Sequence, residues 1–122
     1  MKLFAIIGAL GGLSGVALGA FGAHSLKGTL TASMLDTFET GARYQMYHSL
    51  ALLVVAWAVE RFGAPLFTVS GWCFVAGIVL FSGSLYILAF TGIRWIGAIT
   101  PIGGLAFLAG WGMLAYGFWK NL

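Results

Sequence analysis

Four long stretches without charged residues divide the chain. They cover residues 3–23, 44–59, 62–93 and 95–119. A helix needs about 20 mostly apolar residues to cross the hydrocarbon core of a membrane, and charged side chains at the end of a span can extend to the interface. The pattern therefore predicts four transmembrane helices. They are expected near residues 3–23, 44–62, 65–90 and 95–119.

The connection between the first two predicted spans has a pattern of its own. Within residues 32–43, apolar side chains fall on one helical face and charged or polar side chains on the other. Glu39 precedes Arg43 by four residues, which favours an ion pair on the helix surface. We expect a short amphipathic helix at the membrane interface, which either stands apart from the second span or runs into it with a bend at Gly41.

Glycine and proline mark the expected turns. Residues 63–65 and 91–92 contain such breakers between predicted spans. Pro101 lies inside the last span, where its missing N–H can kink the helix. Trp111 and Trp119 suit the far membrane interface, where aromatic side chains gather.

The composition agrees with a membrane protein. The chain is 61% hydrophobic and 7% charged, whereas soluble domains carry about 25% charged residues. Its net charge of +3 is scattered, so it does not form a nucleic-acid surface, and it suits contact with lipid headgroups. A lone cysteine, Cys73, excludes an intrachain disulfide and a cysteine-based zinc site. We expect an all-α integral membrane protein with one domain, residues 1–122.

Glycines are spaced four apart in the first predicted helix. The set comprises Gly8, Gly11, Gly12, Gly15 and Gly19. On one helical face such small residues let a second helix approach closely; a glycine-lined passage is the alternative. The same segment also has features of a signal peptide, with Lys2 as its basic end, although signal peptides have a shorter apolar core.

Polar groups from all four predicted helices are expected to meet at one end of the bundle. This predicted polar cluster comprises His24, Glu39, Arg43, Tyr47, His48, Ser82, Ser84, Tyr86 and Thr100. At about 1.5 Å per residue, His48 should lie roughly 6–8 Å inside the second span from Arg43. His48 is either a packed, hydrogen-bonded histidine or a group that exchanges a proton or ligand.

Patterns of catalytic residues are not found in the sequence. The two histidines and three acidic residues lie on separate elements, without a metal-binding spacing such as His-Glu-x-x-His. No serine occupies a Gly-x-Ser-x-Gly elbow. We therefore predict no catalytic residues, no cofactor and no metal, and a protein that is not an enzyme.

Four sequence blocks resemble a known family. They are residues 21–27, 39–50, 81–86 and 100–104. They are similar to the small membrane proteins of domain of unknown function 423, also called UPF 0382. The resemblance extends over essentially the whole chain. It implies a four-helix integral membrane protein in a bacterial plasma membrane, and it brings no activity, substrate or cofactor.

Two kinds of function fit these features. The first is a non-enzymatic structural or accessory protein that packs as a homo-oligomer or with a membrane partner, in contact with lipids. The alternative is a small transporter, channel or lipid-binding protein with a polar site at the Arg43/His48 end. Basic residues divide equally between the two sides of the predicted topology; if Arg43 is paired internally, the positive-inside rule tips the termini to the cytoplasm.

Overall fold

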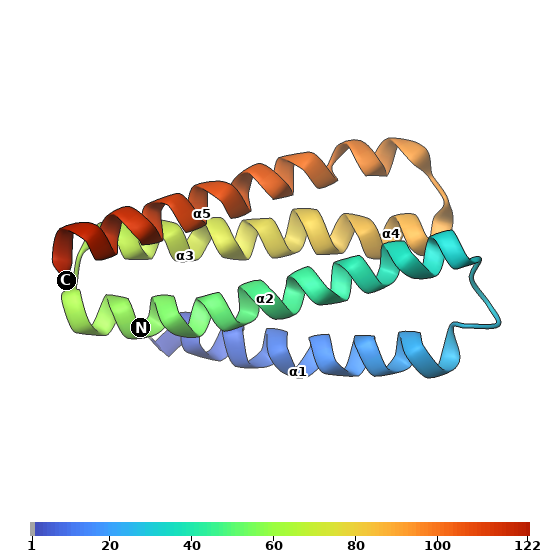
Figure 1. The fold of residues 1–122 in the computed structure, drawn as a ribbon, viewed down its shortest axis with the longest axis horizontal. Helices are drawn as coiled ribbons and strands as arrows, with labels where there is room; N and C mark the ends of the chain where they lie inside the picture. Colours follow the sequence, from blue (N-terminus) through green and yellow to red (C-terminus); the bar gives the residue numbers. More distant parts are fainter. Residues whose placement is uncertain (1) are drawn as a thin grey trace.

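The computed structural model describes residues 2–122, and within that range every regular element is helical. Long helices run up and down side by side, and both chain termini lie at the same end (Figure 1). In chain order the elements are α1 (Lys2–Ser25), α2 (Ala32–Phe62), α3 (Pro65–Gly77), the π-helical turn η1 (Ile78–Ser82), α4 (Gly83–Thr91), the 3₁₀ turn η2 (Arg94–Ala98) and α5 (Thr100–Asn121). Together α3, η1 and α4 form one continuous rod.

Helix α2 differs from the expected short helix followed by a span. It runs without interruption through all 31 residues, and the Thr31 side chain caps its first turn by accepting a hydrogen bond from the Met34 N–H at 3.1 Å. Gly41 is buried inside this helix. The amphipathic segment is therefore the beginning of α2. Measured from Ala32, His48 lies about 24 Å along the helix, near its middle, and not close to one end.

The predicted turns after α2 and α4 are formed by glycine. Gly63 and Gly92 have φ values of 65° and 68°, a left-handed conformation that glycine adopts without a Cβ clash. Each backbone N–H closes the preceding helix, on Val59 and Leu88 respectively. Pro101 lies in the first turn of α5, where a proline fits. Pro101 therefore does not kink the middle of a helix, as was expected, but lies where η2 ends and α5 begins.

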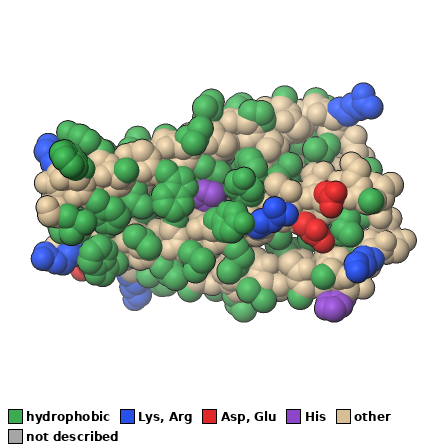
Figure 2. All heavy atoms as spheres, viewed as in Figure 1, with side chains coloured by type: hydrophobic (Ala, Val, Ile, Leu, Met, Phe, Trp, Pro, Cys, Tyr) green, Lys and Arg blue, Asp and Glu red, His purple; other side chains and the backbone are tan. Residues whose placement is uncertain are grey.

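Three of the long helices have the length and composition to cross a membrane. They are Lys2–Ser25, the continuous rod Pro65–Thr91 and the stretch Arg94–Asn121. Helix α2 is not among these three spans, and it carries charged residues towards both of its ends, Asp36, Glu39 and Arg43 at one and Glu60 and Arg61 at the other. Figure 2 shows most charged side chains towards the two ends of the molecule, one basic side chain nearer the middle, and hydrophobic side chains over much of the rest of this face.

Helix α5 packs against α3 and η1 through aromatic rings and glycines. Phe67, Phe74 and Phe81 recur every seventh residue, and each lies against one glycine of α5. The matching glycines are Gly117, Gly110 and Gly103, in antiparallel order. A Cβ added at Gly110 would lie 2.7 Å from the Phe74 ring. We call this arrangement the Phe–Gly ladder; it allows close approach between helices.

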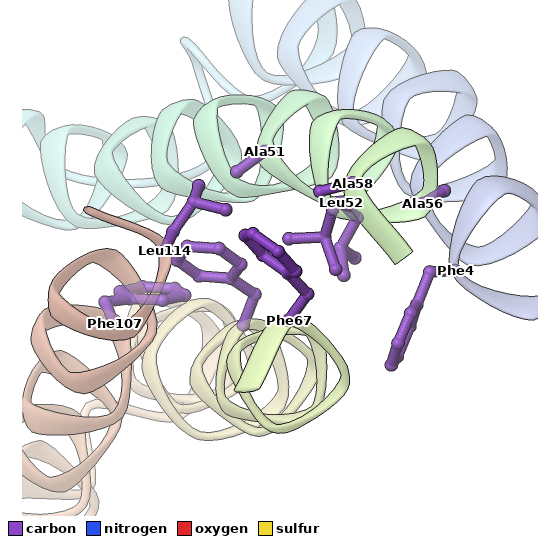
Figure 3. Close-up of a cluster of buried hydrophobic side chains, with 10 residues drawn as sticks. Phe4, Ala51, Leu52, Ala56, Ala58, Phe67, Phe107 and Leu114 are labelled. Carbon is purple, nitrogen blue, oxygen red and sulfur yellow. The ribbon is translucent and has the colours of Figure 1, made fainter. Parts of the chain in front are cut away.

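A hydrophobic core fills the space among α2, α3 and α5. Leu52 and Phe67 are fully buried, and Phe107 and Leu114 are 4% exposed. Figure 3 shows Leu52, Phe67, Phe107 and Leu114 converging between these helices, with Phe4 standing to one side. The Phe4 ring lies against Gly71 of α3. Helix α1 otherwise packs along α2, so α2 lies between α1 and the rod formed by α3, η1 and α4.

Candidate functional site

His48 lies in the interior at the middle of α2. Its Nδ1–H donates to the Tyr44 carbonyl at 2.6 Å, and its Nε2 accepts from the indole N–H of Trp111 at 3.0 Å. A carbonyl can only accept and an indole can only donate, so these partners fix the neutral Nδ1–H tautomer. The imidazole stacks on Phe107, with ring centroids 3.5 Å apart and planes 8° from parallel. Both nitrogens of His48 are therefore occupied: Nδ1 by a carbonyl of α2 itself, and Nε2 by a bond that joins α2 to α5.

Trp111, the partner of His48, does not lie where its position in the sequence predicts. It was expected at the far interface, but it lies opposite His48 in the middle of the bundle. That prediction was wrong, because α5 begins at Thr100 and Trp111 is therefore near the centre of the helix. Trp111 and His48 both lie near the middle of their helices. This similar depth could have predicted that the two side chains meet.

A cavity opens beside this pair, between α2 and α5. Its volume is about 560 Å³. We call it the aromatic cavity; its lining residues are Tyr44, Tyr47, His48, Phe81, Pro101, Gly104, Leu105, Phe107, Leu108 and Trp111. Tyr47 is 50% exposed at its edge. Since both His48 nitrogens already have partners, the cavity offers an apolar surface and little polar chemistry.

Gln45 forms a second interior contact, which the sequence analysis did not single out. Its Nε2 donates to the Gly11 carbonyl at 2.9 Å and to the Ser14 Oγ at 2.8 Å, both in α1. Its Oε1 accepts from the Tyr86 hydroxyl of α4 at 2.6 Å. One amide thus joins three helices. A buried amide inside an apolar run was the available signal, since polar side chains in membrane helices often bond across to neighbours.

Serine hydroxyls form three further interhelical bonds. Ser82, at the end of η1, donates to the Gly41 carbonyl at 2.7 Å. The hydroxyls of Ser84 and Thr100 lie 2.6 Å apart and join α4 to α5. Ser70, which the sequence analysis did not single out, donates to the Gly110 carbonyl at 2.7 Å. These contacts satisfy buried polar groups by connecting helices.

The predicted polar cluster is therefore dispersed. His48 bonds to α5, Tyr86 bonds to Gln45, Ser82 bonds to α2, and Ser84 bonds to Thr100. His24 is exposed at the end of α1 and lies apart from these contacts. Within residues 2–122, no group of three His, Cys, Asp or Glu side chains could hold a metal ion. The interior polar residues form separate helix-to-helix contacts and no single reactive centre.

Glu39 and Arg43 lie on another side of α2. Both line a groove between α1 and α2, with a volume of about 400 Å³. Glu39 is half-buried and Arg43 is exposed. In the described part of the chain, their charged atoms do not approach within the 4.0 Å of an ion pair. The expected Glu39–Arg43 pair is thus not formed in this structure.

The predicted packing glycines of α1 divide into two groups. A Cβ added at Gly8 would lie 2.8 Å from the Ser49 carbonyl oxygen, and one at Gly15 would lie 3.0 Å from the Met46 sulfur. Gly11 lies against the buried Ser49 hydroxyl, the only buried side-chain polar atom without a hydrogen-bond partner among the described residues. A Cβ at Gly12 or Gly19 meets nothing within 4 Å. Gly12 and Gly19 are therefore not part of the close contact with α2.

Comparison with known proteins identifies the family. A family model described as "Protein of unknown function (DUF423)" matches residues 18–104. The chain belongs to this family. The UPF0382 membrane protein YwdK of Bacillus subtilis is 50% identical over the full length of both chains. The UPF0382 membrane protein SSP2132 of Staphylococcus saprophyticus is 51% identical, across 98% of this chain and 99% of its own.

Membership in DUF423 confirms the resemblance seen in the four sequence blocks and identifies the chain as a membrane protein. The names of these relatives give no reaction, substrate or transport activity. No solved structure matches the chain. The matched region contains Glu39, Arg43 and His48, whereas Gly15 and Val16 of the groove precede it. Trp111 and the last two glycines of the Phe–Gly ladder follow it.

Proposed function

We propose that this DUF423 protein crosses the membrane four times as one domain, with α2 as the fourth span. Two neighbours of α2, which are α1 and the rod of α3, η1 and α4, are both apolar enough to cross a membrane. A helix packed between two membrane-crossing helices crosses with them. Both termini at one end of the molecule also suit an even number of spans (Figure 1).

The length of α2 accommodates its charged residues. Its 31 residues extend about 46 Å, whereas the hydrocarbon core of a bilayer is about 30 Å thick. About 20 residues cross that core, and counting them back from Glu60 reaches Thr40. The first turns of α2 then project beyond the hydrocarbon, and Arg43 lies about 5 Å inside its boundary, within reach of the interface.

The function that the interior supports best is structural or accessory, without catalysis. The observation that carries this proposal is that the interior polar groups bond to other helices: His48 to Trp111, Gln45 to Gly11 and Tyr86, Ser82 to Gly41. Such contacts replace the hydrophobic driving force that helices lack in lipid. The protein then acts by packing, as a homo-oligomer or with another membrane protein, in a bacterial plasma membrane.

Topology is tested by placing single cysteines in a Cys73→Ser background. Gly28→Cys lies in the connection before α2, Ala64→Cys lies in the turn after it, and Asn121→Cys lies at the C-terminus. With a membrane-impermeant maleimide on intact cells, four spans predict labelling either of Gly28→Cys alone or of Ala64→Cys and Asn121→Cys without Gly28→Cys, because the first position lies on the opposite side from the other two. Labelling of Gly28→Cys and Ala64→Cys on the same side would show that α2 does not cross, and would overturn the proposed topology.

The accessory role is tested by native mass spectrometry of the protein released gently from membranes. We expect a homo-oligomer or a co-purifying membrane protein. Monomers alone, with no bound protein, would contradict this role. A second candidate function, lipid binding at the Arg43 end, is supported by the groove between α1 and α2 and is developed next.

A further inference from the structure

The groove between α1 and α2 combines a charged rim with an apolar floor. We call it the Arg43 groove; its main lining residues are Gly15, Val16 and Gly19 of α1 and Glu39, Arg43 and Met46 of α2. Gly19 contributes no side chain, and a Cβ there would meet nothing within 4 Å, so the groove is open at this point. The two charged residues are one helical turn apart on the same face of α2.

Each charged residue has room for an external partner. Among the described residues, the side chains of Glu39 and Arg43 do not form an ion pair within 4.0 Å, and neither side chain makes a hydrogen bond. A charge at the edge of the hydrocarbon is costly unless it pairs or reaches water. A ligand that carries both a negative and a positive group would satisfy both residues at once.

The depth of the groove matches that of lipid headgroups. If α2 crosses the membrane as proposed, Glu39 lies at the hydrocarbon boundary and Arg43 about 5 Å inside it. Gly19 and Gly15 lie deeper along α1, towards the membrane interior, and Met46 is one turn beyond Arg43. The charged end of the groove is thus at headgroup level, and its apolar end is at the level of acyl chains.

We propose that the Arg43 groove binds a phospholipid whose headgroup carries a phosphate and a primary ammonium, as phosphatidylethanolamine does. The Arg43 guanidinium, with its planar fork of donors, contacts the phosphate. The Glu39 carboxylate accepts hydrogen bonds from the ammonium. Val16 and Met46 contact the start of an acyl chain. This inference rests on the proposed placement of α2 across the membrane.

The lining of the groove discriminates between two zwitterionic headgroups. A choline group has no N–H to donate to Glu39, and proteins hold it with aromatic faces. The Arg43 groove has no aromatic residue in its lining, whereas the aromatic cavity on the other side of α2 has Tyr44, Tyr47, Phe81, Phe107 and Trp111. The groove therefore favours ethanolamine over choline.

The experiment is a lipid titration of purified, delipidated protein, read by native mass spectrometry. The probes are phosphatidylethanolamine, phosphatidylcholine and phosphatidylglycerol with identical acyl chains. The variants are Arg43→Gln and Glu39→Gln. Arg94→Gln and Asp36→Asn are matched controls, because each removes one charge from the same end of the molecule and neither residue lines the groove. Circular dichroism checks that every variant is folded.

Each variant has its own expected signature. The wild type should bind phosphatidylethanolamine about tenfold more tightly than phosphatidylcholine, which is the order of one charge-assisted hydrogen bond. Arg43→Gln should weaken binding of all three lipids, because each contains a phosphate. Glu39→Gln should remove the preference for ethanolamine over choline and should strengthen binding of phosphatidylglycerol. The two controls should bind as the wild type does.

Three outcomes would overturn the proposal. Equal binding of the three lipids by the wild type would show no headgroup recognition. Tightest binding of phosphatidylglycerol would indicate an anionic lipid site. Unchanged binding in Glu39→Gln and Arg43→Gln would indicate that the two residues pair with each other or face water. The same spectra count protein copies, and cysteine labelling reports topology, so the accessory role, the four-span topology and the lipid site can each fail separately.

Discussion

The two outer helices are attached to the molecule in different ways. Helix α5 packs through the Phe–Gly ladder, in which aromatic rings lie over Gly110 and Gly117, and the Phe81 backbone lies against Gly103. Helix α1 packs through Gly8, Gly11 and Gly15 against Ser49 and Met46 of α2, and Gln45 adds hydrogen bonds to Gly11 and Ser14.

The difference shows two solutions to one problem. Lipid tails are as apolar as the helices, so helices in a membrane associate through close packing and hydrogen bonds. The α3–α5 contact relies mainly on the fit of rings against glycines, whereas the α1–α2 contact relies more on hydrogen bonds to α1. The α1–α2 side also carries the groove lined by Glu39 and Arg43, so the more polar attachment lies beside the candidate ligand site.

The largest expected effect is in the Phe–Gly ladder. Gly110→Leu places a bulky side chain where a Cβ alone would lie 2.7 Å from the Phe74 ring. Because α3 and α5 are closely packed here, neither backbone can move away easily. We expect a loss of about 3 kcal/mol in the free energy of unfolding, which is at the upper end of the range typical of overpacked cores. Thermal unfolding in detergent measures it.

Gly112→Leu is the matched control for the ladder, because a Cβ at Gly112 meets nothing within 4 Å. It should change the free energy of unfolding little. If the two variants unfold at the same temperature, ring-to-glycine packing does not hold α5 in place.

The next effect concerns the polar attachment of α1. Gln45→Leu removes hydrogen bonds to Gly11, Ser14 and Tyr86. We expect a loss of about 1–2 kcal/mol in the free energy of unfolding, because bonds between membrane helices are individually modest. Combining Gln45→Leu with Tyr86→Phe should cost less than the sum of the two single changes, since both remove the same bond. Strict additivity would argue against this network.

A smaller effect is expected at the bond between α2 and α5. Trp111→Phe keeps an aromatic ring beside His48 but removes its hydrogen bond to Nε2. We expect a loss of about 1 kcal/mol in the free energy of unfolding. Nitrogen NMR of His48 measures the loss of this bond directly: the chemical shift of Nε2 should change in Trp111→Phe, whereas Nδ1 should stay protonated. Trp119→Phe, at a residue 84% exposed, should leave both readings unchanged.

The smallest effect separates the two groups of α1 glycines. Gly12→Ala should raise the free energy of unfolding by about 0.5 kcal/mol, because alanine is the better helix former and a Cβ there meets nothing within 4 Å. Gly8→Ala should lower it, because the new Cβ meets the Ser49 carbonyl oxygen and Leu52. If the two variants had equal effects on the free energy of unfolding, Gly12 would belong to the packing face, as the sequence predicted.

Local features of this fold could be predicted from the sequence. The turns at Gly63 and Gly92 and the start of α2 near Ala32 depend on residues close to them in the chain. The sequence left open whether the amphipathic segment stands apart from the second span or runs into it with a bend at Gly41, and the structure shows one continuous helix. The Tyr86 ring and the Ser82 hydroxyl pack on Gly41 from outside α2, and such support is invisible in a local pattern.

Contacts between helices could not be predicted from the positions of the helices in the sequence alone. The bond from Trp111 to His48 depends on α2 and α5, which run in the same direction (Figure 1), lying side by side, and spans and turns do not determine which helices are neighbours. The repeats Phe67–Phe74–Phe81 and Gly103–Gly110–Gly117 are both visible in the sequence at an interval of seven residues. Read together, they would have indicated the register of α3 against α5.

The most direct measurement is a crystal structure grown from a lipid mesophase that contains phosphatidylethanolamine. It tests whether the interior polar residues hold helices together while the Arg43 groove faces a lipid. We predict His48 bonded to Tyr44 and Trp111, with headgroup density between Arg43 and Glu39. A ligand bonded to His48 in place of Trp111, or Glu39 closed on Arg43 with no density beside them, would contradict this division of roles.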